Sequence, residues 1–190
     1  MSKAVLISIR PKWVEKIANG EKTIEVRKTK PKLDTPFKCY IYCTLPKYPH
    51  EDFIATDYPM PQFYGGGKVI GEFTCDRIYK IDKDSTDFLF KFGRLSVYNQ
   101  AAEEKCGLCV AMTDDELHGY LGHCQGYGWH ISDLRIYDTP KELSEFKTLC
   151  RVDADCCACP YYNYTKMGCD GRVIGRPPQS WCYVDDVQAK

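Results

Sequence analysis

The stretch Gly20-Glu21-Lys22-Thr23-Ile24-Glu25-Val26-Arg27-Lys28 decides the fold of this chain. Its two β-branched apolar residues alternate with polar ones, which is the period of a strand with one buried face. Lys22, Glu25 and Arg27 are therefore held on or beside one strand, directly after a glycine. Such a group binds an anion or the edge of a nucleobase, or else forms an ion-paired strand face in solvent.

A strand and a short helix are predicted just before this stretch. Residues 4–10 alternate in the same way and predict a strand. Pro11 suits the first position of a helix because that position needs no amide donor. Trp13 and Ile17 lie one turn apart and mark an apolar face. Gly20 suits the left-handed residue that follows a helix, so the unit is strand, helix, glycine, strand.

Five motifs in chain order extend this pattern: Ile7-Ser8-Ile9-Arg10-Pro11, Glu21-Lys22-Thr23-Ile24-Glu25-Val26-Arg27, Val69-Ile70-Gly71-Glu72-Phe73, Gly126-Tyr127-Gly128-Trp129-His130-Ile131-Ser132-Asp133-Leu134 and Pro177-Pro178-Gln179-Ser180-Trp181-Cys182-Tyr183-Val184. Together they resemble the ASCH domain family, a branch of the PUA-like β-barrels, in its bacterial and phage form. The resemblance spans residues 3–146 and 176–186. It implies an α+β fold, a PUA-like β-barrel with short flanking helices and a Cys-rich insertion before the last strand.

The expected organisation has three parts: a barrel over 1–146, a Cys-rich insertion over 147–175, and the closing strand with the C-terminus over 176–190. A capping box at Thr113 and Glu116 predicts a short helix as far as Leu121. A capped helical turn is expected over 139–143, with Phe146 packed inward. The strands of one curved sheet or barrel are expected at 4–10, 22–28, 37–43, 68–80, 129–137 and 181–184.

Composition predicts one globular domain with an elaboration. The chain has 190 residues, 44% of them hydrophobic, and a net charge of zero. It has neither an apolar run of the roughly 20 residues that span a bilayer nor a signal-peptide pattern. We therefore expect a monomer in the cytoplasm with no membrane partner.

The charge is unevenly distributed. Residues 1–50 contain 11 Lys and Arg against 4 Asp and Glu. A basic segment that also holds the charged motif is what a phosphate-binding face requires. The alternative is a solvated basic edge strand, on which lysine discourages pairing with other chains.

Cysteine is the second conspicuous feature, with 12 residues in the chain. Two Cys-x-x-Cys pairs occur, Cys106/Cys109 and Cys156/Cys159, and such a pair can place two thiolates on one metal. In a reducing compartment metal binding is favoured over disulfides. We therefore expect one structural Zn²⁺, and no other cofactor, with the ligands Cys150, Cys156, Cys159 and Cys169.

Other assignments of the cysteines stay open. Cys157 can replace Cys156, Cys182 can replace Cys150, or the two Cys-x-x-Cys pairs can share one metal. An iron–sulfur cluster, a disulfide or a set of free thiols are further alternatives. The cysteines on strand-like segments are expected in the core: Cys39, Cys43 and Cys75.

The aromatic segment Gly126–His130 is the third feature. Its glycines allow a backbone to approach a ligand closely. Tyr127 and Trp129 offer flat faces on which a base can stack, and His130 can donate or accept a hydrogen bond near neutral pH. The alternative is that Trp129 fills the barrel core and that His130 satisfies a buried partner.

These features predict a module that recognises RNA, or a nucleotide or nucleobase, in a basic aromatic cleft. Lys22 and Arg27 are expected to contact phosphate or a base edge, and Glu25 to accept a hydrogen bond from a base or ribose. The full set of predicted binding residues is Ser8, Lys12, Lys22, Thr23, Glu25, Arg27, Tyr127, Trp129 and His130.

The resemblance also implies an enzymatic alternative, since small ASCH-like bacterial proteins include amidohydrolases that remove an acetyl group from cytidine. Lys22 matches their catalytic lysine, and Glu25 stands where they carry a threonine. Their catalytic glutamate falls at Val110 and Ala111, which cannot replace it, so binding is preferred over catalysis. If the chain is an enzyme, Lys22 and Glu25 are its catalytic pair. A third hypothesis is a protein-interaction adaptor built around the Cys-rich insertion.

Overall fold

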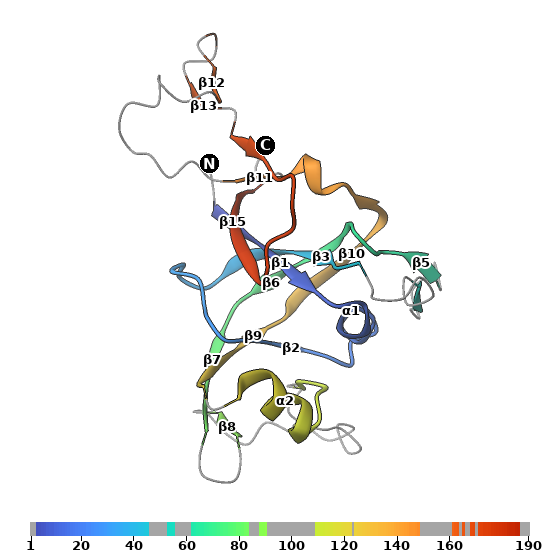
Figure 1. Cartoon of the computed structure of the whole chain (residues 1–190), viewed down its shortest axis with the longest axis vertical. Helices are drawn as coiled ribbons and strands as arrows, with labels where there is room; N and C mark the ends of the chain where they lie inside the picture. Colours follow the sequence, from blue (N-terminus) through green and yellow to red (C-terminus); the bar gives the residue numbers. More distant parts are fainter. Residues whose placement is uncertain are drawn as a thin grey trace.

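The computed structural model describes residues 3–45, 53–55, 62–83, 88–90, 109–122, 124–148, 161–163, 165, 168–169 and 171–186. Within these ranges the chain forms two main sheets (Figure 1). The larger has the order β10-β6-β3-β1-β15-β11-β14, with β1 Lys3–Ile9, β3 Phe37–Cys43, β6 Val69–Cys75, β10 Ser132–Lys141, β11 Lys147–Thr148, β14 Arg172–Val173 and β15 Trp181–Asp185. The smaller has the order β2-β9-β7-β8, with β2 Ile24–Arg27, β7 Ile78–Lys83, β8 Phe88–Phe90 and β9 Gly126–His130.

The helices and two hairpins surround these sheets. The helices are α1 Pro11–Ala18 and α2 Asp114–Leu121, with a 3₁₀ turn at Leu143–Glu145. One hairpin pairs β4 Phe53–Ala55 with β5 Gln62–Tyr64, and the other pairs β12 Tyr162–Asn163 with β13 Gly168–Cys169. In the described part of the chain, neither helix has the length and apolar character needed to cross a membrane.

Strand β1 lies at the centre of the larger sheet and is buried on both faces. It pairs in parallel with β3 and antiparallel with β15, where Ile7 lies opposite Trp181. Val5 and Ile7 enter one core cluster, and Ala4 and Leu6 enter another on the opposite face. The predicted pairing of the C-terminal strand is thus confirmed, and it covers an edge of β1 that would otherwise be open.

The strands expected in one curved sheet or barrel divide between two sheets. β6 leads into β7 at Asp76 and Arg77, and β9 leads into β10 at Ile131. β6 pairs with β10 in one sheet, whereas β7 pairs with β9 in the other. The same two chain segments thus connect both sheets, and period-2 alternation along a strand does not reveal this change of sheet.

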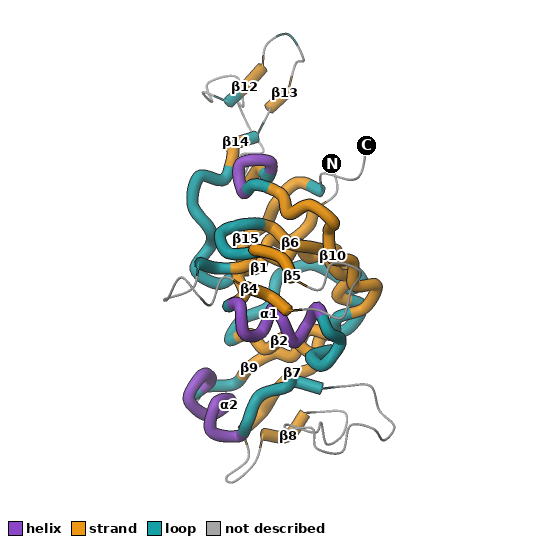
Figure 2. Tube along the Cα trace, turned by 90° about the vertical axis from the view of Figure 1, so that its right-hand side faces the viewer, coloured by secondary structure: helices purple, strands orange, loops and turns teal. Residues whose placement is uncertain are grey.

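Both predicted helices are confirmed (Figure 2). Apolar side chains of α1 pack into the core between the sheets, and Gly20 after it has a φ of 75°. Thr113 and Glu116 form the expected capping box of α2. Leu117 of α2 packs on the outer face of the smaller sheet, against Ile24 and neighbouring residues.

The helical turn expected over 139–143 is wrong. Residues 139–141 belong to β10, which pairs with β6 as far as Lys141 and Val69. The 3₁₀ turn starts only after Glu142. Strand pairing with β6 overrides the local capping pattern, although Phe146 is fully buried as expected.

Candidate functional site

The register between β2 and β9 brings the charged strand and the aromatic segment together, as predicted. Glu25 lies opposite Trp129, and Arg27 lies opposite Tyr127. Because side chains alternate across a strand, these four share one face of the smaller sheet. His130 lies opposite Ile24 on the other face. One antiparallel strand pair thus brings together two motifs that are far apart in the sequence.

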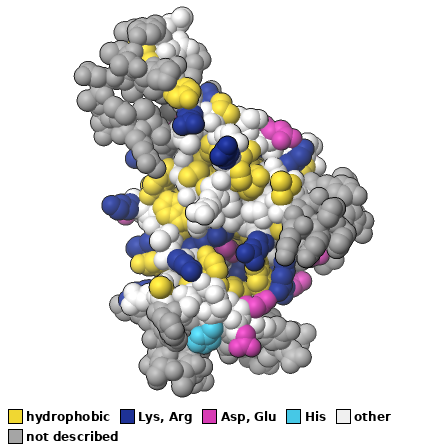
Figure 3. All heavy atoms as spheres, viewed as in Figure 1, with side chains coloured by type: hydrophobic (Ala, Val, Ile, Leu, Met, Phe, Trp, Pro, Cys, Tyr) yellow, Lys and Arg dark blue, Asp and Glu magenta, His cyan; other side chains and the backbone are white. Residues whose placement is uncertain are grey.

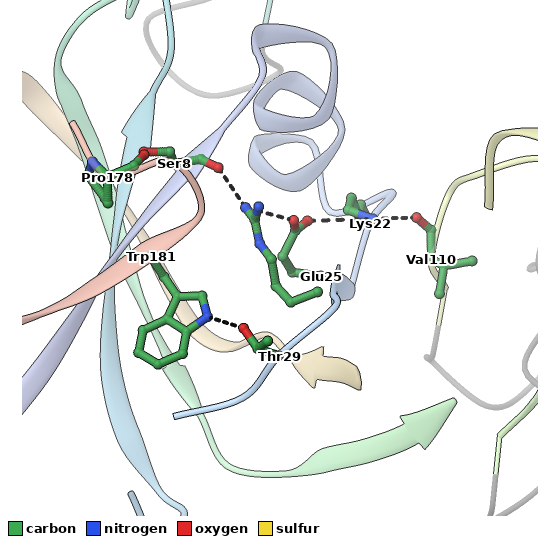
Figure 4. A network of polar contacts seen from close by, with 8 residues as sticks. Ser8, Lys22, Glu25, Thr29, Val110, Pro178 and Trp181 are labelled. Atoms are coloured by element: carbon green, nitrogen blue, oxygen red, sulfur yellow. Dashed lines mark hydrogen bonds and ion pairs between the residues drawn. The ribbon is translucent and has the colours of Figure 1, made fainter. Parts of the chain in front are cut away.

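The charged residues form a continuous polar chain in the interior (Figure 4). Lys22 Nζ donates a hydrogen bond to the carbonyl oxygen of Val110 at 2.6 Å and lies 3.6 Å from Glu25 Oε2. Glu25 Oε1 lies 3.0 Å from Arg27 Nη2. Arg27 Nη2 also donates to the carbonyl oxygen of Ser8 at 2.6 Å. The chain thus connects the segment before α2 to β2 and then to β1.

Burial sets the electrostatics of this chain. Lys22 is 2% exposed and Glu25 5% exposed, so the two charges face each other and the core. Burial is the main reason that the pKa of Lys22 is lowered below its ordinary value, and the positive charge of Arg27 lowers it further. The carboxylate of Glu25 opposes this shift. Lys22 Nζ also lies 5.2 Å from the ring centroid of Trp13.

Three buried polar atoms on this face have no hydrogen-bond partner among the described residues. They are Glu25 Oε2, Arg27 Nε and Trp129 Nε1. Leaving a buried donor or acceptor unpaired costs about 1–3 kcal/mol, so each such atom in a folded protein calls for an explanation. We call Lys22, Glu25, Arg27 and Trp129 the inner site.

The expected stacking role of Trp129 is corrected by its burial. Its ring is 0% exposed and packs edge-on against Phe37, with centroids 5.8 Å apart. Trp181 covers it on another side at 5.9 Å. No face of this ring is open to a base, because a large aromatic side chain on the inner face is the natural core filler. Tyr127 is half-buried, and Lys30 Nζ lies 5.9 Å from its ring centroid.

Other predicted binding residues have structural partners. Ser8 Oγ donates to the carbonyl oxygen of Pro178 at 2.6 Å, which ties β1 to the segment before β15. Thr23 Oγ1 accepts a hydrogen bond from the amide of Cys109 at 2.7 Å. Both hydroxyls thus hold strands together at the margins of the inner site.

Two predicted residues lie outside the inner site. Lys12 is exposed and forms an ion pair with Glu116, which links α1 to α2. His130 Nδ1 lies 2.6 Å from Asp76 Oδ1, where β6 turns into β7. The structure therefore separates these two side chains from Glu25 and Arg27.

Sequence reasoning missed two contributors to the inner site. The carbonyl of Val110 accepts from Lys22, and the ring of Trp13 lies beside the same ammonium group. A backbone carbonyl does not depend on the side-chain type, so the sequence held no signal for Val110. The position of Trp13 on the apolar face of the predicted helix was a signal, but for packing.

The predicted zinc ligands fall largely outside the described ranges. Cys150, Cys156 and Cys159 are not described, and of Cys169 only the strand β13 is. Among the residues that the structure describes, no group of three or more His, Cys, Asp or Glu is placed to hold a metal ion. The expected core positions of Cys39, Cys43 and Cys75 are confirmed, since all three are 0% exposed.

The zinc hypothesis makes a direct prediction. Purified protein should contain about one zinc per chain, and a chelator should expose residues 147–175 to protease before the rest unfolds, because metal binding and local folding are coupled. Cys159→Ser should abolish the metal, whereas Cys124→Ser, at an exposed cysteine, should not. Elemental analysis without metal, together with 12 freely titratable thiols, would exclude the site.

The strand order and the buried polar chain define a class of protein, an α+β module whose N-terminal strand and helix lead into a charged strand. Comparison with solved structures identifies the particular fold. The chain is similar to the crystal structure of ASCH from Zymomonas mobilis, with a TM-score of 0.52 and 16% identity over 96% of this chain and 88% of that one.

Two substituted forms of the same Zymomonas mobilis protein match in the same way. A tyrosine-to-phenylalanine form and a serine-to-alanine form each give a TM-score of 0.52 and 16% identity, covering 97% and 96% of this chain and 92% and 89% of theirs. No protein-family model and no curated protein matches the sequence. The chain therefore has the ASCH fold, and the resemblance drawn from its motifs is confirmed at the level of the fold.

Proposed function

We propose that this chain recognises RNA or a nucleotide by binding the edge of a pyrimidine base at the inner site. The observation that carries the proposal is a set of three buried atoms, at Glu25, Arg27 and Trp129, that have no hydrogen-bond partner within the described part of the chain. A carboxylate oxygen accepts, and the guanidinium and indole N–H groups donate. Unpaired groups of this kind are expected where a ligand supplies the missing partners.

The inventory of these atoms favours a pyrimidine. Two donors and one acceptor complement an edge with two acceptors and one donor. Uracil presents O2, N3–H and O4, and cytosine presents O2, N3 and an N4 amine, so both match. Guanine presents one acceptor and two donors on its Watson–Crick edge and does not. Reading of this edge is how proteins recognise unpaired RNA bases.

A base reaches the inner site only if the side chains of Tyr127 and Lys30 move, because Trp181, which covers Trp129, is held by Thr29. Tyr127 lies opposite Arg27, and Lys30 Nζ lies 5.9 Å from the Tyr127 ring centroid. Arg27 and Lys22 already donate hydrogen bonds to the carbonyl oxygens of Ser8 and Val110, so both side chains are held in place before a base enters. The proposed setting is the cytoplasm, where the basic N-terminal quarter adds attraction for phosphate.

Calorimetric titration with cytidine, uridine and guanosine and their monophosphates tests the proposal. Trp129→Phe removes the indole N–H from the inner site but keeps an aromatic ring in the core, so it should weaken pyrimidine binding about 5- to 100-fold while leaving the fold intact. Tyr137→Phe is the matched control, because it removes a hydroxyl that donates to Glu72 in the larger sheet. Equal affinity for guanosine, or unchanged binding by Trp129→Phe, would refute pyrimidine recognition at this site.

Lys22 favours a second candidate function, hydrolysis of the amide of an acetylated cytidine. A buried lysine with a lowered pKa is more nucleophilic than a solvated one, and Glu25 lies 3.6 Å away as a base. The same titration with acetylcytidine separates the two functions. The binding proposal predicts a complex without turnover, whereas a hydrolase would lose about 10²–10⁴-fold of its turnover in Glu25→Gln.

A further inference from the structure

A second hollow lies beside β15. It is a cavity of about 920 Å³, lined by residues 172–176 together with 181–183 and Thr148. This volume lies near the upper end of the range of about 300–1,000 Å³ for small-molecule sites. The nine predicted binding residues do not include any of its lining residues, and neither proposed function uses it.

Two aromatic rings in its wall are fixed in position. Trp181 and Tyr183 are both half-buried, with ring centroids 5.4 Å apart and planes at 76°. Trp181 Nε1 donates a hydrogen bond to Thr29 Oγ1 at 3.0 Å. The amide of Lys32 donates to the hydroxyl of Tyr183 at 2.7 Å. The rings are therefore held at their polar ends before any ligand binds, which lowers the entropic cost of stacking.

Positive charge borders the same cavity. Arg172 and Arg176 line it and are exposed. Lys30 and Lys32 are exposed on the segment that anchors the two rings. Figure 3 shows hydrophobic side chains bordered by Lys and Arg on the face that carries β15. Guanidinium groups beside flat rings match phosphates beside bases.

We propose that this cavity is a second binding site, which takes single-stranded nucleic acid. Arg172 and Arg176 contact successive phosphates, and bases stack on Trp181 and Tyr183. Such a combination of a basic groove and aromatic platforms is how single strands are bound without strict sequence preference. An acidic peptide would satisfy the arginines but would leave the aromatic faces without flat partners.

The cavity and the inner site share one wall. Trp181 lines the cavity and packs against Trp129, with ring centroids 5.9 Å apart. A strand lying in the cavity would therefore pass beside the residue that covers the inner site. The second site does not depend on base recognition at the inner site, and the two are measured separately.

The test uses fluorescence anisotropy of labelled ten-nucleotide oligouridine and oligothymidine with the full chain, in saturating free uridine so that the inner site is already occupied. Arg172→Gln combined with Arg176→Gln should weaken binding at least tenfold. The slope of log affinity against log salt should become shallower by about 1.4, or about 0.7 for each lost phosphate contact. Arg135→Gln is the matched control, because Arg135 is exposed on β10 at the opposite edge of the sheet. Tyr183→Leu should weaken binding about 5- to 100-fold through lost stacking.

The outcomes separate this inference from the proposed function. The double arginine variant should keep its affinity for free pyrimidine nucleosides, and Trp129→Phe should keep the salt slope of oligonucleotide binding. Binding of both oligonucleotides, or preference for the ribose form through 2′-hydroxyl contacts, supports the second site. Equal losses in Arg135→Gln and the double variant, no oligonucleotide binding by the wild type, or equally tight binding of polyglutamate would overturn it.

Discussion

Arg27→Met is expected to lower the free energy of unfolding by about 3–5 kcal/mol, because it breaks a buried ion pair from one side. The side chain of Arg27 is 8% exposed, and its Nη2 serves both Glu25 and the carbonyl oxygen of Ser8. Without it the buried carboxylate of Glu25 keeps only Lys22 at 3.6 Å, beyond hydrogen-bond distance. Urea unfolding followed by fluorescence of the three tryptophans measures the loss.

Two comparisons make this prediction specific. Lys12→Met breaks an exposed ion pair with Glu116 and should cost at most about 1 kcal/mol. Combining Arg27→Met with Glu25→Gln should cost less than the sum of the two single variants, because the second change removes the charge that the first left unpaired. If Arg27→Met costs no more than Lys12→Met, the polar chain does not stabilise the fold.

Trp129→Ala is expected to cost about 3–5 kcal/mol, the usual range for removing a large aromatic side chain from a core. Its ring is fully buried and contacts Phe37 and Trp181. Trp129→Phe should instead stay within about 1 kcal/mol of the wild type, since the smaller ring loses packing while an unpaired N–H is removed. Thermal and urea unfolding of both variants give the comparison.

The difference between Trp129→Ala and Trp129→Phe in the free energy of unfolding tests whether the indole N–H lacks a partner in the free protein. A loss in Trp129→Phe as large as that in Trp129→Ala would mean that removing the N–H offsets none of the lost packing, which is the result expected if the N–H has a partner in the free protein. It would then be unavailable to a ligand, and the proposed base recognition would lose one of its two donors. If Trp129→Phe leaves the free energy of unfolding unchanged but binds pyrimidines more weakly, Trp129 serves both core packing and base recognition.

The sequence predicted both helices and the strands β1 and β3 well because their signals are local. Pro11 and Gly20 bracket α1, Thr113 and Glu116 cap α2, and alternation marks β1 and β3. Each signal depends on backbone preferences within a few residues. The motif order also carried enough information to identify the ASCH fold, which the solved Zymomonas mobilis structure matches.

The sequence could not predict the division into two sheets or the fate of each polar side chain. Alternation places Glu25 and Arg27 on one face of β2, but only pairing with β9 and packing beneath β1 make that face an interior one. Burial then makes the charges that were expected to contact a ligand partners of one another, and three atoms have no hydrogen-bond partner among the described residues. The cavity beside β15 is likewise lined by separate segments of the chain, and the sequence does not show that these segments lie together. Local sequence determines which face of a strand a residue occupies, whereas long-range pairing determines what that face meets.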